Sequence, residues 1–133
     1  MKDSAGKPKF SIISRFKSFR HAFFGLWDML ATEPNAWAHA AATIVALVLS
    51  WWLEIDRKGF ALIVIAIVGV WMAEAFNTVL EIMMDFITSR QFSPVVKRIK
   101  DISAAAVLIA SIGALVIGIA VLGEPLCKRM MIF

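Results

Sequence analysis

The sequence contains a single cysteine, Cys127, among its 133 residues. One cysteine excludes a disulfide within the chain and offers no cysteine cluster for a metal, so we treat Cys127 as chemically inert. Charged residues are also scarce, at 18%, whereas hydrophobic residues make up 60%. Soluble domains average about 45–50% apolar residues. The composition therefore favours a membrane protein.

Two nucleotide-binding motifs are absent. No Gly-x-Gly-x-x-Gly occurs, and no Gly-x-x-x-x-Gly is followed by Lys and Ser or Thr. Gly113 and Gly118 have the second spacing, but Ile119 follows them inside an apolar run, which indicates helix packing and not a phosphate-binding loop. If the protein binds a nucleotide, side chains and a metal must hold it.

Three apolar stretches approach the length of about 20 residues that a membrane span requires, namely residues 36–53, 59–87 and 102–123. We predict three transmembrane helices within a single domain that covers residues 1–133. The third stretch contains small residues that allow close helix contact, namely Ser103, Ala104, Ala105, Ala106, Gly113 and Gly118. The first 35 residues have no separate apolar segment, so no cleavable signal peptide is expected.

The N-terminal part is predicted to lie on the membrane surface. Residues 1–10 are expected to be a disordered basic leader. Residues 11–31 then repeat apolar side chains every three or four positions, with basic side chains on the other face. This pattern is typical of a helix in the headgroup plane. Packing against a soluble domain is the alternative, but so short a chain has little soluble domain to offer.

Positive charge is unevenly distributed along the chain. Ten of the fourteen Lys and Arg residues lie before the first predicted span or between the second and third. Four lie on the other side, namely Arg57, Lys58, Lys128 and Arg129. This distribution predicts a multi-pass protein with a cytoplasmic N-terminus. The net charge of +4 therefore reflects membrane topology, and no nucleic-acid partner is expected.

Four polar side chains recur on one face where the second predicted span ends: Glu74, Asn77, Glu81 and Asp85. At about 100° per residue they fall within about 80° of each other. Glu74 lies about 22 Å along the helix from Gly59, just inside a hydrocarbon core of about 30 Å. Carboxylates in register repel each other, so they require a metal ion, a lysine or both. A solvated helix end is the alternative interpretation.

Further polar residues approach the same membrane boundary. Glu33 and His39 do so from the first predicted span, and Lys97, Lys100 and Asp101 from the third. Carboxylates with lysines at one level suit Mg²⁺ and a polyphosphate. Asp101 either caps the third helix or contacts a nucleotide. We expect His39 to be a buried, hydrogen-bonded histidine and His21 to be solvated.

These residues resemble the signature of the small prokaryotic diacylglycerol kinase and undecaprenol kinase family. The resemblance rests on Glu74-x-x-Asn77-Thr78-x-x-Glu81-x-x-x-Asp85 and Lys97-x-x-Lys100-Asp101-x-x-Ala104-Ala105-Ala106-Val107. Phe19-x-x-Ala22-x-x-Gly25-Leu26 and Glu33-x-Asn35-x-x-x-His39 match its N-terminal pattern. Val79-Leu80 and Ser103 depart from the family pattern. The segment from Thr88 to Ser93 lacks the acid and histidine of the enterobacterial diacylglycerol kinase.

The resemblance implies an all-α, homotrimeric kinase of the bacterial inner membrane that uses ATP and Mg²⁺ to phosphorylate a lipid alcohol. It implies that Glu74 is the general base and that Glu74 and Asn77 contact the lipid substrate. Glu33 and Glu81 would ligate the metal. The nucleotide would be contacted by Glu33, Asn77, Glu81, Asp85, Lys100 and Asp101. The substrate is diacylglycerol or undecaprenol, and the motifs look more like those of the undecaprenol branch.

Two other classes of protein stay open on the residues alone. A transporter or proton pathway could use the acidic face as a relay, and a non-catalytic membrane scaffold would have neither activity. Phosphorylation of a lipid separates the kinase from both.

Overall fold

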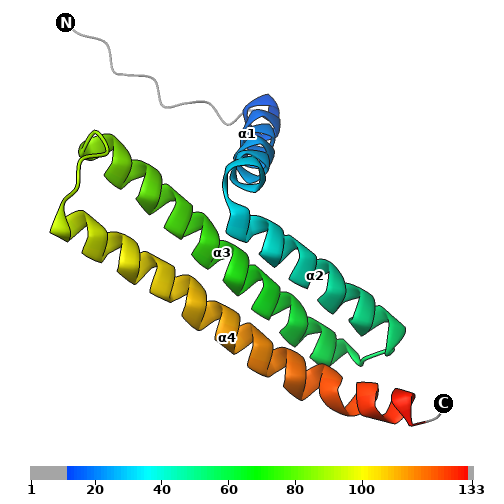
Figure 1. The fold of residues 1–133 in the computed structure, drawn as a ribbon. Coiled ribbons are helices and arrows are strands. Elements are labelled where there is room, and N and C mark those ends of the chain that lie inside the picture. Colours follow the sequence, from blue (N-terminus) through cyan, green and yellow to red (C-terminus); the bar gives the residue numbers. More distant parts are fainter. Residues whose placement is uncertain (1–11, 132–133) are drawn as a thin grey trace, which may run out of the picture. The chain divides into compact units, whose positions relative to one another are not determined.

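A computed structural model describes residues 12–131 of the chain, and all of the regular structure in this range is helical. Four helices, labelled α1 to α4 in Figure 1, follow one another through short connections. The chain divides into two compact units, residues 1–32 and residues 33–133, which are considered separately. The all-α prediction is confirmed for the described residues, whereas the expected leader of residues 1–10 lies outside them.

The first unit contains one described helix, α1 (Ile12–Thr32), which matches the predicted surface helix with a shift of one residue. Its side chains Phe16, Phe19, Phe23 and Trp27 are exposed. Because they recur at three and four residues, they share one face of the helix. An exposed aromatic face suits the headgroup region of a bilayer, and this placement stays a prediction.

The second unit begins with α2 (Pro34–Trp52) at the expected proline. Pro34 occupies the first turn, where its missing N–H costs nothing because that group has no partner inside a helix. Glu33 precedes it in an extended conformation, and its side chain makes no capping hydrogen bond with a described residue. The carboxylate of Glu33 is therefore available for other contacts.

Helices α3 (Arg57–Ile87) and α4 (Pro94–Met130) form an antiparallel pair with the most extensive helix contact in this unit. Figure 1 shows α2 running alongside α3. At about 1.5 Å per residue, α3 is about 46 Å long and α4 about 55 Å. Helix α4 extends beyond the predicted span of residues 102–123 at both ends. It begins earlier because Pro94, a residue favoured in the first helical turn, starts it before the apolar run.

Helices α3 and α4 approach closely at the end where α3 begins. Asp56 caps α3 by accepting a hydrogen bond from the backbone N–H of Gly59 at 2.9 Å. A Cβ atom at Gly59 would lie 3.0 Å from Cγ1 of Val121 in α4 and 3.0 Å from the Asp56 carboxylate. Only a residue without a side chain allows this contact without a shift.

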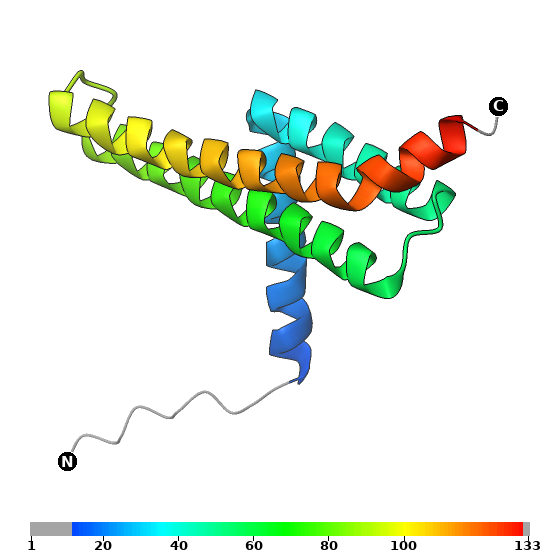
Figure 2. The same ribbon diagram turned by 90° about the horizontal axis from the view of Figure 1, so that it is seen from below.

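Helix α4 contains Pro125 near its C-terminal end. A proline has no N–H to donate to the carbonyl four residues earlier, and its ring crowds that carbonyl. Figure 2 shows the last turns of α4 out of line with the rest of the helix. We attribute this bend to Pro125.

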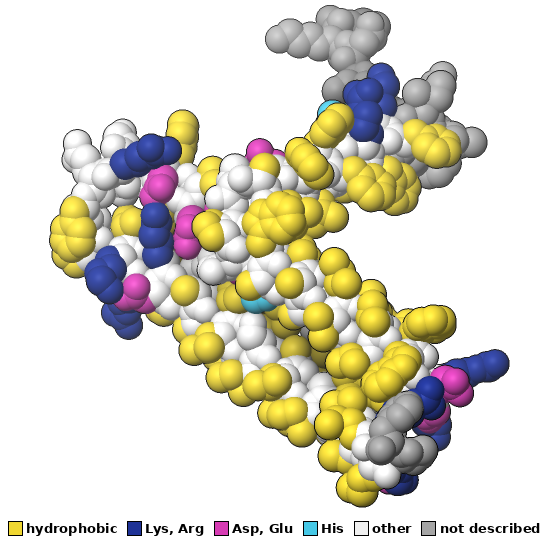
Figure 3. All heavy atoms as spheres, turned by 45° about the vertical axis from the view of Figure 1, so that its right-hand side comes forward, with side chains coloured by type: hydrophobic (Ala, Val, Ile, Leu, Met, Phe, Trp, Pro, Cys, Tyr) yellow, Lys and Arg dark blue, Asp and Glu magenta, His cyan; other side chains and the backbone are white. Residues whose placement is uncertain are grey.

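Two helices among the described residues, α3 and α4, are long and apolar enough to cross a membrane. Helix α2 is not one of them, because Asn35 and His39 dilute its apolar character. Many large apolar side chains of α3 and α4 are exposed, such as Ile65 (64%) and Ile109 (70%), whereas a core helix of a soluble protein would bury them. Figure 3 shows hydrophobic side chains along these helices and charged ones gathered toward their ends. Two of the three predicted spans are thereby supported, and a crossing by α2 stays a prediction.

Candidate active site

The acidic face predicted on α3 is present, and its burial changes along the helix. Glu74 is fully buried (0% exposed) and Asn77 almost so (5%). Glu81 and Asp85 are half-buried. Asn77 Nδ2 donates a hydrogen bond to Glu81 Oε1 at 3.2 Å, so these two side chains share the face as expected. The Glu74 carboxylate thus lies inside the protein, while those of Glu81 and Asp85 lie closer to the C-terminal end of α3 and are partly exposed.

Glu74 faces His39 of α2. The distance between His39 Nε2 and Glu74 Oε2 is 3.6 Å, longer than a good hydrogen bond. Among the described residues, neither carboxylate oxygen of Glu74 has a hydrogen-bond partner, and His39 Nε2 has none either. Buried polar atoms without partners are rare in proteins and often belong to functional sites. The expected hydrogen bond of His39 is therefore not found, although most of its side chain is covered (15% exposed).

Glu33 belongs to the same cluster of carboxylates. The pKa of Glu33 is raised above its ordinary value of 4.5, first by partial burial and then by the negative charges of Glu81 and Glu74. Both effects favour the neutral acid. Glu33, from the start of α2, therefore lies close enough to the acidic face of α3 to be repelled by it, and a cation between them would relieve the repulsion.

These carboxylates do not form a closed metal site. Within residues 12–131, no group of three or more His, Cys, Asp or Glu side chains is arranged to hold a metal ion. Mg²⁺ prefers oxygen ligands and often takes only one or two carboxylates, with substrate phosphates and water completing its shell. Glu33 and Glu81 can provide such oxygens, so this donor set fits Mg²⁺ together with a phosphate-bearing substrate.

A buried hydrogen-bonded chain links α3 to α4 beside the acidic face. Ser103 of α4 is 6% exposed, and its Oγ lies 2.6 Å from Asn77 Oδ1 and 2.9 Å from the carbonyl oxygen of Lys100. In the sequence, Ser103 is one of several small residues suited to helix packing. The only sequence signal for a polar role is that Ser103 follows Lys100 by three positions, which places the two on one helix face.

Lys100 of α4 forms an ion pair with Asp85 of α3. Both side chains are partly exposed, at 32% and 40%. Such a pair contributes about 0–1 kcal/mol to stability, because water screens the charges. The two residues predicted to contact a nucleotide thus lie together at the same end of the helices as Glu81. Their contribution to holding the fold is small.

Asp101 pairs with Lys97 at 2.5 Å on the exposed surface of α4. It does not cap the helix, because α4 begins seven residues earlier at Pro94 with Ser93 as the N-cap residue. The capping alternative for Asp101 is therefore wrong, and its contact with a nucleotide stays a prediction.

The connection between α3 and α4 forms one wall of an open pocket of about 580 Å³ at this end. Asp85, Lys100 and Asp101 line this pocket together with Arg90. Ser89 and Arg90 have φ angles of 50° and 60°, a region that residues other than glycine rarely adopt. Such strained backbone tends to occur at functional sites. Arg90 is therefore a candidate that no sequence motif singled out.

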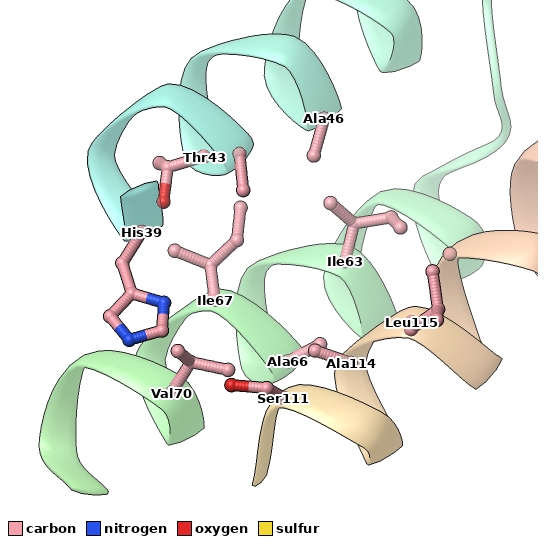
Figure 4. A pocket seen from close by; sticks show the side chains of 12 residues that line it. His39, Thr43, Ala46, Ile63, Ala66, Ile67, Val70, Ser111, Ala114 and Leu115 are labelled. Carbon is pink, nitrogen blue, oxygen red and sulfur yellow. The ribbon is translucent and has the colours of Figure 1, made fainter. Parts of the chain in front are cut away.

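An apolar cavity of about 310 Å³ lies between α2, α3 and α4. Figure 4 shows His39 at one end of it and Ala46, Ile63 and Leu115 at the other. Alanine side chains from all three helices leave the space open, and Thr43 and Ser111 are among its few polar members. The cavity thus begins beside the group that faces Glu74.

The family model described as prokaryotic diacylglycerol kinase matches residues 20–122 of the chain. This range includes Glu33, the acidic face of α3, and Lys100 through Ser103.

Individual relatives agree with this match. The undecaprenol kinase of Bacillus subtilis (strain 168) is 35% identical over 104 residues, which are 78% of this chain and 84% of the relative. The diacylglycerol kinase of Escherichia coli (strain K12) is 32% identical over 100 residues, 75% of this chain and 81% of the relative. The diacylglycerol kinase of Synechocystis sp. is 29% identical over 113 residues, 85% of this chain and 65% of the relative. The chain therefore belongs to the prokaryotic diacylglycerol kinase family of membrane-bound bacterial lipid kinases, as its motifs predicted.

Proposed function

We propose that this protein transfers the γ-phosphate of ATP to the hydroxyl group of a membrane lipid alcohol, undecaprenol or diacylglycerol. The observation that carries the proposal is the environment of Glu74. Its carboxylate is fully buried and has no hydrogen-bond partner among the described residues, yet it faces His39 at the end of an apolar cavity. A lipid alcohol requires an acceptor for its hydroxyl proton and apolar space for its tail.

Glu74 acts as the general base in this proposal. Its carboxylate accepts the proton of the lipid hydroxyl as the hydroxyl oxygen forms a bond to the γ-phosphorus of ATP. The bond from that phosphorus to the bridging oxygen breaks, and ADP leaves with the electron pair. His39 Nε2 faces the same space and holds the hydroxyl beside Glu74, while Asn77 orients the site. Positioning of this kind supplies much of the catalysis of phosphoryl transfer.

Lys100 holds the phosphates of ATP at the end of α3 and α4. Asn77, Asp85 and Asp101 contribute further contacts to the nucleotide. The open pocket beside the α3–α4 connection has the size and the mixed charge that a nucleotide requires. Glu33 and Glu81 would hold Mg²⁺ in this site. When bound, Mg²⁺ neutralises charge on the phosphate oxygens.

The proposed membrane arrangement places the site at the cytoplasmic face of the bacterial inner membrane. Helices α2, α3 and α4 cross the bilayer, and α1 lies on its surface. Basic residues at the α3–α4 connection support this orientation, because cytoplasmic segments carry an excess of Lys and Arg. We further propose a homotrimer, which would cover part of the apolar surface that α3 and α4 expose.

A labelled-phosphate assay tests the proposal. The purified protein in lipid nanodiscs is incubated with ATP labelled at the γ-phosphate and with undecaprenol and diacylglycerol side by side. We expect a labelled lipid phosphate from at least one alcohol, and its loss when EDTA removes Mg²⁺. The ratio of the two products identifies the substrate.

A negative result is equally informative. If neither alcohol is labelled, the kinase proposal fails. Proton flux across vesicles without lipid phosphorylation would instead support the transport alternative, and the absence of both activities would support a scaffold.

A further inference from the structure

The hydrogen bonds around Asn77 fix which way its side-chain amide points. Glu81 Oε1, on one side, is a carboxylate oxygen that accepts hydrogen bonds, so the NH₂ group of Asn77 must face it. The carbonyl oxygen of Asn77 then faces Ser103. An amide rotated by 180° would place two acceptor oxygens against each other.

Ser103 is the donor that this arrangement requires. Its hydroxyl has one proton and two neighbouring acceptors, Asn77 Oδ1 at 2.6 Å and the Lys100 carbonyl at 2.9 Å. The shorter distance is the one to Asn77. Both Ser103 and Asn77 are almost fully buried, so water competes little for these bonds. Buried networks of this kind are sensitive to the loss of a single donor.

We propose that Ser103 is a positioning residue of the phosphoryl-transfer site, which acts by locking the amide of Asn77 and, through it, the carboxylate of Glu81. This inference rests on the proposed function for the role of Glu81 as a metal ligand. Groups that orient a metal-binding carboxylate by hydrogen bonding affect metal affinity although they never touch the metal.

The chain of contacts also joins the two halves of the site. Ser103 Oγ donates to Asn77, which contacts the predicted metal ligand Glu81. It also lies 2.9 Å from the backbone carbonyl of Lys100, whose ammonium group is predicted to contact phosphate. The hydroxyl of Ser103 therefore sets α4 against α3 at the level where both halves must meet one ATP molecule.

The first test observes the amide of Asn77 directly and requires no activity. In the full-length protein with ¹⁵N-labelled asparagine, the side-chain NH₂ signals of Asn77 are assigned by comparison with Asn77→Ala. Ser103→Ala should shift these signals or split them into two sets, because the amide loses its fixed orientation. Ser50→Ala is the matched control, since Ser50 is also buried but its side-chain hydroxyl donates to a carbonyl of its own helix, that of Ala46.

The second test measures metal binding without turnover. Mn²⁺ binding in the presence of a non-hydrolysable ATP analogue is followed by electron paramagnetic resonance. We expect Ser103→Ala to weaken Mn²⁺ binding about 10-fold, the lower end of the effects seen for groups that orient metal ligands. Asn77→Ala should weaken it at least as much, and the double variant no more than Asn77→Ala alone, because Ser103 acts through Asn77.

Three results would overturn the inference: unchanged Asn77 signals in Ser103→Ala, Mn²⁺ binding weakened no more than in Ser50→Ala, or additive losses in the double variant. If the unmodified protein neither binds Mn²⁺ with the analogue nor labels a lipid, the proposed function fails instead. The Asn77 signals would then still decide whether Ser103 orients the amide.

Discussion

His39 Nε2 lies 3.6 Å from Glu74 Oε2, and the two groups approach each other from different helices inside the protein. The separation is too long for a strong hydrogen bond but short enough for an electrostatic interaction between the two groups. A hydroxyl group that donates to Glu74 and accepts from a protonated Nε2 would satisfy both. We therefore expect Glu74 and His39 to bind a substrate hydroxyl between them and not to stabilise the fold as an ion pair.

Replacing Glu74 with Gln tests whether Glu74 is the general base. The amide keeps the shape of the side chain but accepts a proton poorly, so we expect kcat to fall by about 10²–10⁴-fold. Nucleotide binding, measured with a fluorescent ATP analogue, should stay within a factor of about 2 because the phosphates are held elsewhere. Glu124→Gln, an exposed glutamate near the other end of α4, is the control. An equally severe loss of nucleotide binding in Glu74→Gln would contradict the base role.

Replacing Glu81 with Ala should weaken the binding of magnesium and nucleotide together. The variant loses one of two predicted metal-binding carboxylates and leaves Asn77 Nδ2 without its acceptor. We expect the Mg²⁺ concentration at half-maximal activity to rise about 10-fold or more. A titration of initial rate against free Mg²⁺ at saturating ATP measures this. An unchanged titration would exclude Glu81 as a ligand.

The raised pKa of Glu33 predicts a pH dependence of stability. The folded protein binds this proton more tightly than the unfolded chain, so between 4.5 and the higher folded pKa the folded state carries more protons. Stability linked to Glu33 is therefore fully present below pH 4.5 and is lost as the pH rises through the folded pKa. The Glu33 contribution to the melting temperature should therefore fall with pH across this window, and it is measured as the difference between the unmodified protein and a variant in which residue 33 does not titrate.

In the variant Glu33→Gln, the Glu33 contribution to the dependence of melting temperature on pH should be absent, because glutamine does not titrate. Saturation of the unmodified protein with Mg²⁺ and an ATP analogue should also reduce this dependence, since a bound cation favours the ionised carboxylate. If Glu33→Gln shows the same dependence on pH as the unmodified protein, the pKa of Glu33 is not raised by burial and by the nearby carboxylates in solution.

Replacing Lys100 with Ala separates a binding role from a structural one. The Lys100–Asp85 pair is partly exposed, so its loss should reduce stability by about 1 kcal/mol or less. The KM for ATP should nevertheless rise about 10-fold, since a phosphate contact is lost. Lys128→Ala is the matched control, because Lys128 also pairs with a carboxylate, that of Glu124, near the other end of α4. Equal KM values for the two variants would rule out a phosphate contact.

Filling the apolar cavity should affect the lipid and spare the nucleotide. Ala114→Leu places a larger side chain into the space between α2, α3 and α4. We expect the KM for the lipid alcohol to rise by about 10-fold or more, because one methylene in an apolar pocket changes binding by about 1–3 kcal/mol. The KM for ATP should stay unchanged. The control is Ala120→Leu, an exposed position on the same helix outside the cavity. A rise in both KM values would indicate general damage to the fold.

Much of this architecture could be predicted from local pattern. The spacing of Phe16, Phe19 and Phe23 predicted α1, and Pro34 marked the start of α2. The common face of Asn77 and Glu81 follows from helix geometry alone. Each of these features depends on residues a few positions apart, where the sequence is directly informative.

Features that depend on packing between helices could not be predicted. The bond from Ser103 to Asn77 joins residues 26 positions apart and requires the register of α3 against α4. The missing hydrogen bond of His39 likewise depends on how closely α2 approaches α3. The exclusion of Asp101 as a cap required the true start of α4, which a proline and not the apolar run determines.

The close contact between Gly59 and Val121 means that a small change in the angle between α3 and α4 at this point would produce a larger displacement further along the helices. They approach closely at Gly59. At about 1.5 Å per residue, Glu74 lies about 22 Å and Asn77 about 27 Å further along α3. A tilt of only about 2° at the glycine would then displace Asn77 by about 1 Å. A methyl group added at position 59 should thus alter the proposed phosphoryl transfer about 27 Å away along the helix, because catalysis is sensitive to misplacement of this size.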